Sequence, residues 1–148
     1  MKLDVTENVS AVSFNNVPLD RTIMEDTLKI VANAGINVDM ISMTAPTSEI
    51  FSFGFTVKDD DIPKLLGIVK ELREKDCIAP MINSGNRKIV IKTGTMTNTI
   101  GFAAKVFEIL NRLSAMILMI TTGEDEISVL IRNADADAVC AAFEKELQ

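Results

Sequence analysis

Apolar residues recur at helical spacing in four stretches of the chain. Met24, Leu28 and Val31 are one example, and their intervals of four and three residues place them on one face of a helix. Gly35 follows this stretch, at the point where a helix often ends on a residue with a left-handed backbone. The pattern predicts helices over residues 20–34, 61–75, 100–113 and 134–147.

Shorter apolar stretches between these helices have the pattern of strands. Phe51, Phe53 and Phe55 alternate with small or polar residues, which is the two-residue period of a strand with one buried face. Residues 84–86, with the sequence Ser-Gly-Asn, are typical of a connecting turn. The sequence predicts strands over residues 9–14, 36–43, 50–57, 79–83, 88–93, 115–121 and 127–131.

The chain contains two copies of one unit. A shift of 79 residues superimposes matching residues of the two copies, Met40 on Met119 and Ile41 on Ile120. Each copy has the order β-α-β-β-α, but the second has no segment left for a last strand, whereas residues 3–6 have no role in the first. We therefore expect residues 3–6 to supply the missing strand.

This arrangement predicts an α+β protein made of two ferredoxin-like βαββαβ units, intertwined by an N-terminal strand. The first domain is predicted to span residues 9–83. The second is predicted to combine residues 88–148 with residues 3–6.

The composition is that of a globular protein without imidazole chemistry. Hydrophobic residues make up 47% and charged residues 24% of the chain. A net charge of −6 disfavours nucleic acid as a partner, and the absence of His excludes any site that needs an imidazole. The longest apolar runs, such as residues 115–120, are far shorter than the roughly 18 residues of a membrane span. We therefore expect no membrane association and a cytoplasmic location.

Three segments were weighed as carriers of chemistry. The alternating phenylalanines of "FSFGFTV" resemble an RNA-stacking strand, but core packing explains them better because Glu49 precedes them where an RNA binder needs a cation. The segment "TGTMTNTIGFAA" combines hydroxyls with a helix start, which suits either a small anion or a capped turn. The acidic clusters 59–61 and 124–126 are interpreted as solvated turns, and the two separated cysteines predict neither a zinc site nor a disulfide.

The sequence resembles a known family along most of its length. The segments "GINVDMI", "GTMTNTIGFAAKVFEIL" and "MITTGEDEISVLI" are similar to the tandem ACT domains of the C-terminal regulatory region of aspartokinases, the enzymes that phosphorylate aspartate. The resemblance extends over residues 3–147. It implies a module that binds an amino-acid effector, lysine or threonine, between ACT domains of two chains, and that acts on a separate kinase domain or subunit.

The resemblance also implies a set of effector contacts. The ligand carboxylate is expected on the amides of residues 21–23, and its ammonium is expected to face Asp20 or Asp39. Met43 and Met116 stand where the family commonly has Gln and Asn, so a ligand-free dimerisation module is the alternative. No catalytic residue, cofactor or metal is predicted, and the chain is not expected to be an enzyme by itself. The predicted contacts are Asp20, Arg21, Thr22, Ile23, Asn37, Asp39, Met43, Met116 and Ile117.

Overall fold

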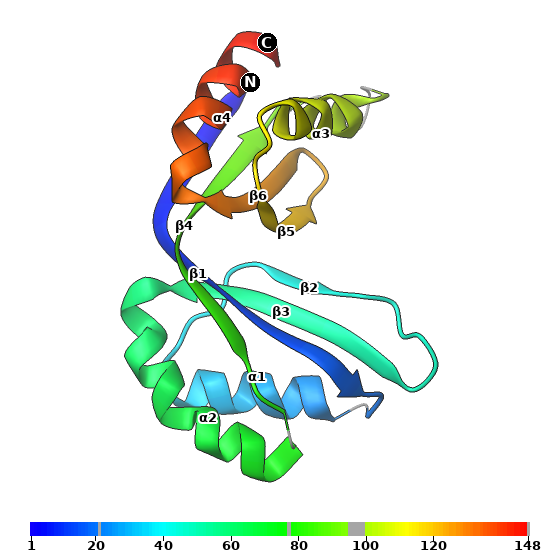
Figure 1. The fold of residues 1–148 in the computed structure, drawn as a ribbon, viewed down its shortest axis with the longest axis vertical. Helices are drawn as coiled ribbons and strands as arrows, with labels where there is room; N and C mark the ends of the chain where they lie inside the picture. The colour runs from blue at the N-terminus through cyan, green and yellow to red at the C-terminus, as the bar shows by residue number, and fades with distance from the viewer. Residues whose placement is uncertain (21, 77, 95–99, 148) are drawn as a thin grey trace. The chain divides into compact units, whose positions relative to one another are not determined.

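The computed structural model describes residues 1–20, 22–76, 78–94 and 100–147 (Figure 1). Four α-helices, one 3-10 helix and six strands alternate in the order that the repeat predicts. The elements are β1 (Lys2–Pro18), α1 (Ile23–Asn33), β2 (Ile41–Met43), β3 (Ile50–Lys58), η1 (Asp59–Asp61), α2 (Ile62–Asp76), β4 (Met81–Lys92), α3 (Phe102–Arg112), β5 (Ile117–Thr122), β6 (Glu126–Arg132) and α4 (Asn133–Glu146).

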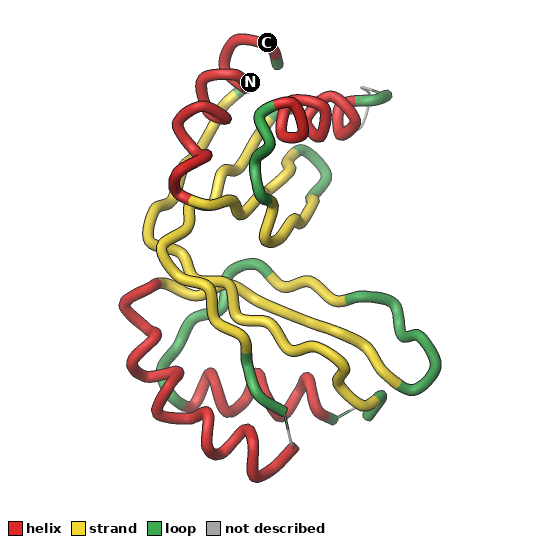
Figure 2. The backbone as a smooth tube through the Cα atoms, viewed as in Figure 1, coloured by secondary structure: helices red, strands yellow, loops and turns green. Residues whose placement is uncertain are grey.

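The contacts within the chain define two compact units. The first unit comprises Asn8–Ser84, and the second combines Met1–Glu7 with Gly85–Gln148. Strands β1 and β4 are neighbours and run through both units, as the yellow tubes of Figure 2 show. The strand order is β2-β3-β1-β4 in the first unit and β1-β4-β6-β5 in the second. Whether the predicted domains fold as these units stays a prediction, which the deletion described in the Discussion tests.

The first unit is an antiparallel sheet covered by two helices. β3 pairs with β1, with Val12 opposite Phe55, and with β2, with Ile41 opposite Phe55. Helices α1 and α2 lie on the same side of these strands (Figure 1). The rings of Phe14 and Phe53 stack with their centroids 4.8 Å apart. Phe51, Phe53 and Phe55 belong to the core, which confirms the packing interpretation of the alternating phenylalanines.

The second unit repeats this plan with the N-terminal strand as its fourth strand. β4 pairs with β6, and β6 pairs with β5, both antiparallel. Leu3 packs against the core that α3, α4 and these strands enclose. The ammonium of Lys92 lies 2.9 Å from the carboxylate of Asp4, and the guanidinium of Arg87 contacts Glu7 at 3.1 Å and also Asp137 of α4. The predicted α+β fold with two ferredoxin-like βαββαβ units, intertwined by the N-terminal strand, is confirmed.

The predicted turn at residues 84–86 is wrong. β4 is one continuous strand, and β1 likewise joins the two predicted strands 3–6 and 9–14. Gly85 has φ 74° and Asn8 has φ 57°, so each strand takes a local irregularity at the boundary between the units without reversing. Because β1 and β4 lie beside each other, their backbone pairing keeps a turn-like sequence extended.

The predicted strand 36–43 is also too long, since β2 covers only Ile41–Met43. Before it, the amide of Asp39 donates to the carbonyl of Thr56 at 3.1 Å, and the amide of Met40 donates to the hydroxyl of Thr56 at 3.0 Å. The side chain of Thr56 thus replaces a regular ladder bond at this point. Helices α1 and α3 begin two or three residues later than the apolar pattern predicts.

Thr27 is a buried hydroxyl in α1 that makes no hydrogen bond within the described part of the chain. Valine has the same shape and a similar helix propensity. The Thr27→Val variant is therefore expected to raise the free energy of unfolding by about 1 kcal/mol, because an unsatisfied polar group leaves the core. Urea denaturation checks this. A lower unfolding midpoint for Thr27→Val would show that the hydroxyl has a partner.

The ion pair between Asp4 and Lys92 predicts a pH dependence. Hydrogen bonds from Lys92 and then Lys2 hold the pKa of Asp4 below its ordinary 3.8, and Asp4 raises the pKa of Lys92 above 10.5. The lowered pKa of Asp4 adds stability that is complete above pH 3.8 and lost as the pH falls through the folded value. The raised pKa of Lys92 adds stability that is present below pH 10.5 and lost as the pH rises through the folded value.

The Asp4→Asn variant should therefore melt a few degrees below the wild type near neutral pH, and this difference should vanish near about pH 2. Melting curves across the pH range measure it. Asp60→Asn is the matched control, because Asp60 is exposed and makes no ion pair with any described residue. A difference that persists unchanged at low pH would contradict the assignment.

Candidate functional site

Two connections of the first unit meet at one end of its sheet. β1 ends where Pro18 lies opposite Ile50, at the start of β3. The amide of Leu19 donates to the carbonyl of Glu49 at 2.7 Å, which fixes the β1–α1 connection against the β2–β3 connection. We call residues 16–23 and 43–52 the loop end of the first unit. It contains most of the effector contacts predicted from the family resemblance.

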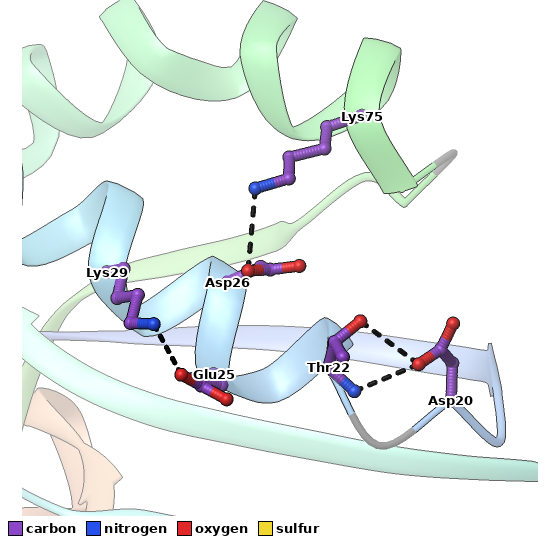
Figure 3. A network of polar contacts seen from close by, with 6 residues as sticks. All are labelled: Asp20, Thr22, Glu25, Asp26, Lys29 and Lys75. Atoms are coloured by element: carbon purple, nitrogen blue, oxygen red, sulfur yellow. Dashed lines mark hydrogen bonds and ion pairs between the residues drawn. The ribbon is translucent and has the colours of Figure 1, made fainter.

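Asp20 has the most defined geometry at the loop end. Its Oδ1 accepts hydrogen bonds from the amide of Thr22 at 2.9 Å and from the hydroxyl of Thr22 at 3.0 Å (Figure 3). The amide bond first and the hydroxyl bond second lower the pKa of Asp20, so the side chain is a carboxylate at neutral pH. Its Oδ2 has no partner among the described residues and is available to a cation.

This geometry changes how a ligand would use the start of α1. The amide of Thr22 is bound by the carboxylate of Asp20, and the amide of Ile23 lies 3.4 Å from the carbonyl of Asp20. A ligand carboxylate can bind these amides only by displacing Asp20. Arg21, the remaining residue of this predicted contact, lies outside the described residues.

The other acids near the start of α1 are already paired. Glu25 binds Lys29 one turn along the helix, and Asp26 lies 3.4 Å from the ammonium of Lys75 on α2 (Figure 3). These pairs stabilise α1 and its packing on α2. Asp20 is therefore the better candidate for an ammonium group of a ligand.

Asn37 and Asp39 do not join this cluster within the first unit. Asp39 is tied to Thr56, which lies six residues beyond Ile50 along β3. At about 3.3 Å per residue, this separation is about 20 Å. A single amino acid bound to Asp20 therefore cannot reach Asp39 of the same chain. Met43 does lie at the loop end, at the end of β2, and is half exposed.

Met116 and Ile117 lie at the start of β5 in the second unit. The amide of Met116 donates to the carboxylate of Asp135 on α4 at 3.2 Å, and the side chain of Met116 is half exposed. Ile117 pairs with Ile131 of β6. The structure thus describes both residues within their own unit.

A small cavity at the loop end was not predicted from the sequence. Its volume is about 140 Å³, and its walls combine apolar and polar side chains from β1, β3 and the β2–β3 connection. Asn16 reaches this wall because β1 is bulged between Phe14 and Val17, and Asn16 has φ 53°. The run "TAPTSE" was interpreted only as a turn, although its hydroxyls were the available signal. The lining residues are Asn16, Thr44, Ala45, Thr47, Ile50, Phe51 and Ser52.

The structure offers no support for the other kinds of site. Among the described residues, no group of three His, Cys, Asp or Glu side chains is placed to hold a metal ion. The hydroxyl-rich anion segment falls largely on residues 95–99, which lie outside the described residues. Within the described part of the chain, no helix is both long and apolar enough to cross a membrane.

Comparison with known proteins identifies the two repeats. Residues 89–147 match the model of the ACT domain family. An aspartokinase of Geobacillus stearothermophilus is 36% identical over 101 residues, which cover 68% of this chain and 24% of that protein. The chain therefore spans about a quarter of the length of this relative.

Solved structures show the same fold over the whole chain. The ligand-free regulatory subunit of aspartate kinase from Thermus thermophilus superposes with a TM-score of 0.91 at 24% identity, covering 100% of this chain and 98% of that one. Aspartokinase III of Escherichia coli, solved in complex with lysine and aspartate, superposes with a TM-score of 0.67 at 19% identity, covering 94% of this chain and 31% of that one. This chain is therefore a tandem ACT-domain protein of the aspartokinase regulatory type.

Proposed function

We propose that the chain binds a free amino acid of the lysine or threonine class and thereby regulates an aspartate kinase domain or subunit. The observation that carries this proposal is the carboxylate of Asp20, which Thr22 holds in place with one oxygen unpartnered. Such an acid suits the ammonium group that every free amino acid carries. The aspartokinase III complex with lysine supports the effector class by analogy.

Binding at Asp20 can regulate a partner only if the bound and free states differ in affinity for that partner. The kinase activity itself belongs to the partner in this proposal, and the chain contributes the effector site. The cytoplasmic location stays a prediction.

A second copy of the chain is the proposed neighbour at this site. β2 is an edge strand whose backbone is paired only on one side. Ile41 and Met43 on this strand and Leu19 at the loop end are about half exposed. An exposed strand edge with apolar side chains favours pairing with another chain. We therefore propose a homodimer in which the partner completes the effector site.

The effector site is tested by thermal melting in the presence of each of the 20 amino acids. A ligand that binds only the folded protein raises its melting temperature. The Asp20→Asn variant should weaken the binding of the active amino acid by about 10- to 100-fold, because a charged hydrogen bond is lost. Asp60→Asn removes the same charge outside the loop end and should leave affinity unchanged.

The remaining outcomes separate the alternatives. Weakened binding in Asp39→Asn but not in Asp20→Asn would move the ammonium site to the strand edge. If no amino acid raises the melting temperature at millimolar concentration while the chain sediments as a dimer, the protein is a ligand-free dimerisation module. A monomer at micromolar concentration would contradict the homodimer.

A further inference from the structure

We propose that the cavity at the loop end receives the side chain of the bound amino acid and selects a short, uncharged, hydrogen-bonding side chain over that of lysine. This inference rests on the proposed function and decides between the effector classes it leaves open. It follows from three properties of the cavity: its uncommitted polar groups, its lack of charge and its size.

The polar groups in the cavity wall are available to a ligand. The side chains of Asn16, Thr47 and Ser52 make no hydrogen bond with any described residue. Together they offer hydroxyl and amide groups that both donate and accept. A cavity with an apolar wall and a few convergent polar groups is the usual form of a small-molecule site.

The backbone around these groups is held in place. The amide and hydroxyl of Thr44 lie 2.8 Å and 3.3 Å from the carbonyl of Ser52, and the amide of Ser52 donates to the hydroxyl of Thr44 at 3.0 Å. Thr47 and Ile50 are bonded to each other through both backbone amides. Thr44 is thus committed to the connection, whereas Thr47 and Ser52 keep their hydroxyls for a ligand. A wall fixed in this way reduces the ordering that binding requires.

The charge of the wall discriminates against lysine. None of the described residues that line the cavity is acidic or basic. An ammonium group placed there would lose water without gaining a carboxylate, which is unfavourable. A hydroxyl or amide would instead find partners in Thr47 and Ser52.

The size and position of the cavity fit a side chain and not a whole ligand. Its volume of about 140 Å³ corresponds to about four or five water molecules at about 30 Å³ each. The bond between Leu19 and Glu49 holds the β1–α1 connection, which carries Asp20, against the β2–β3 connection that forms the wall. The α-ammonium can therefore remain outside the cavity, at Asp20.

Calorimetric titration with threonine, valine and lysine tests the inference on the full chain. Valine has the shape of threonine without its hydroxyl, and lysine carries the charge that the wall rejects. We expect threonine to bind at least about tenfold more tightly than either, because one hydrogen bond or one unpaired charge separates them. Lysine binding as tightly as threonine would overturn the inference while leaving the proposed function intact.

Variants of Ser52 locate the effect. Ser52→Ala should lower the affinity for threonine about tenfold and bring it close to that for valine. Ser52→Asp should reverse the preference, so that lysine binds more tightly than threonine. Ser42→Ala is the matched control, since Ser42 lies on the neighbouring strand outside the cavity and should change nothing.

Circular dichroism spectra confirm that each variant is folded before it is titrated. Unchanged threonine affinity in folded Ser52→Ala would overturn the inference. Binding of none of the 20 amino acids to the wild type would instead overturn the proposed function, and the inference with it.

Discussion

Deletion of residues 1–7 is expected to unfold the second unit or to lower its melting temperature by about 10–20 °C, which corresponds to roughly 3 kcal/mol or more for a unit of this size. These residues form its fourth strand, beside β4. The deletion removes the backbone pairing with β4, the packing of Leu3 on the core and the partners of Arg87 and Lys92. No other described segment is available to take their place in this sheet.

Hydrogen exchange measured by mass spectrometry separates the two units in this experiment. Amides of β4 and β6 should lose protection in the deletion variant. A finer comparison uses Leu3→Asp and Val5→Asp, which place the same charge on the same strand. Leu3 packs against the core, whereas Val5 is 45% exposed, so only Leu3→Asp should reproduce the deletion. Unchanged protection of β4 and β6 after the deletion would refute the intertwined arrangement.

Phe143→Ala is expected to lower the free energy of unfolding by about 3–5 kcal/mol. Phe143 lies on α4, is fully buried, and belongs to the core of the second unit. Its removal takes a large apolar surface out of the core and leaves a cavity that the surrounding strands cannot fill completely. Because β1 and β4 belong to both units, we also expect one shared unfolding transition rather than two.

Phe107→Ala is the matched control for this substitution. Phe107 also lies on a helix of the second unit, α3, but it is 43% exposed. We expect a loss well below that of Phe143→Ala, since most of the removed surface already faces water. Denaturant unfolding followed by circular dichroism measures both variants. Equal losses, or a second transition in the wild type, would contradict the described packing.

The fold was predictable because the chain repeats. A single βαββα unit with a spare strand is ambiguous, but two copies with the same apolar periods restrict the ways in which the strands can be shared. The alternation of Phe51, Phe53 and Phe55 likewise indicated a buried sheet face, and their burial confirms it. These features depend on local period and composition, which a sequence carries directly.

The boundaries between elements were less predictable because neighbours decide them. Ser84, Gly85 and Asn86 have the composition of a turn, yet they lie within β4. Pairing with β1 supplies hydrogen bonds that an isolated turn would not have, and a single left-handed Gly85 absorbs the irregularity. Local propensity is overridden when a long-range partner is present.

The sequence by itself determined that the chain consists of two ACT-type repeats and that Asp20 is a candidate ligand contact. Only the tertiary structure decided that Thr22 holds Asp20, that Asp39 lies about 20 Å away along β3, and that Asn16 and Ser52 line one cavity. The physical reason is that periodicity and motifs reflect interactions between residues close in the chain. A binding site depends on distances between residues that only strand pairing brings together or keeps apart.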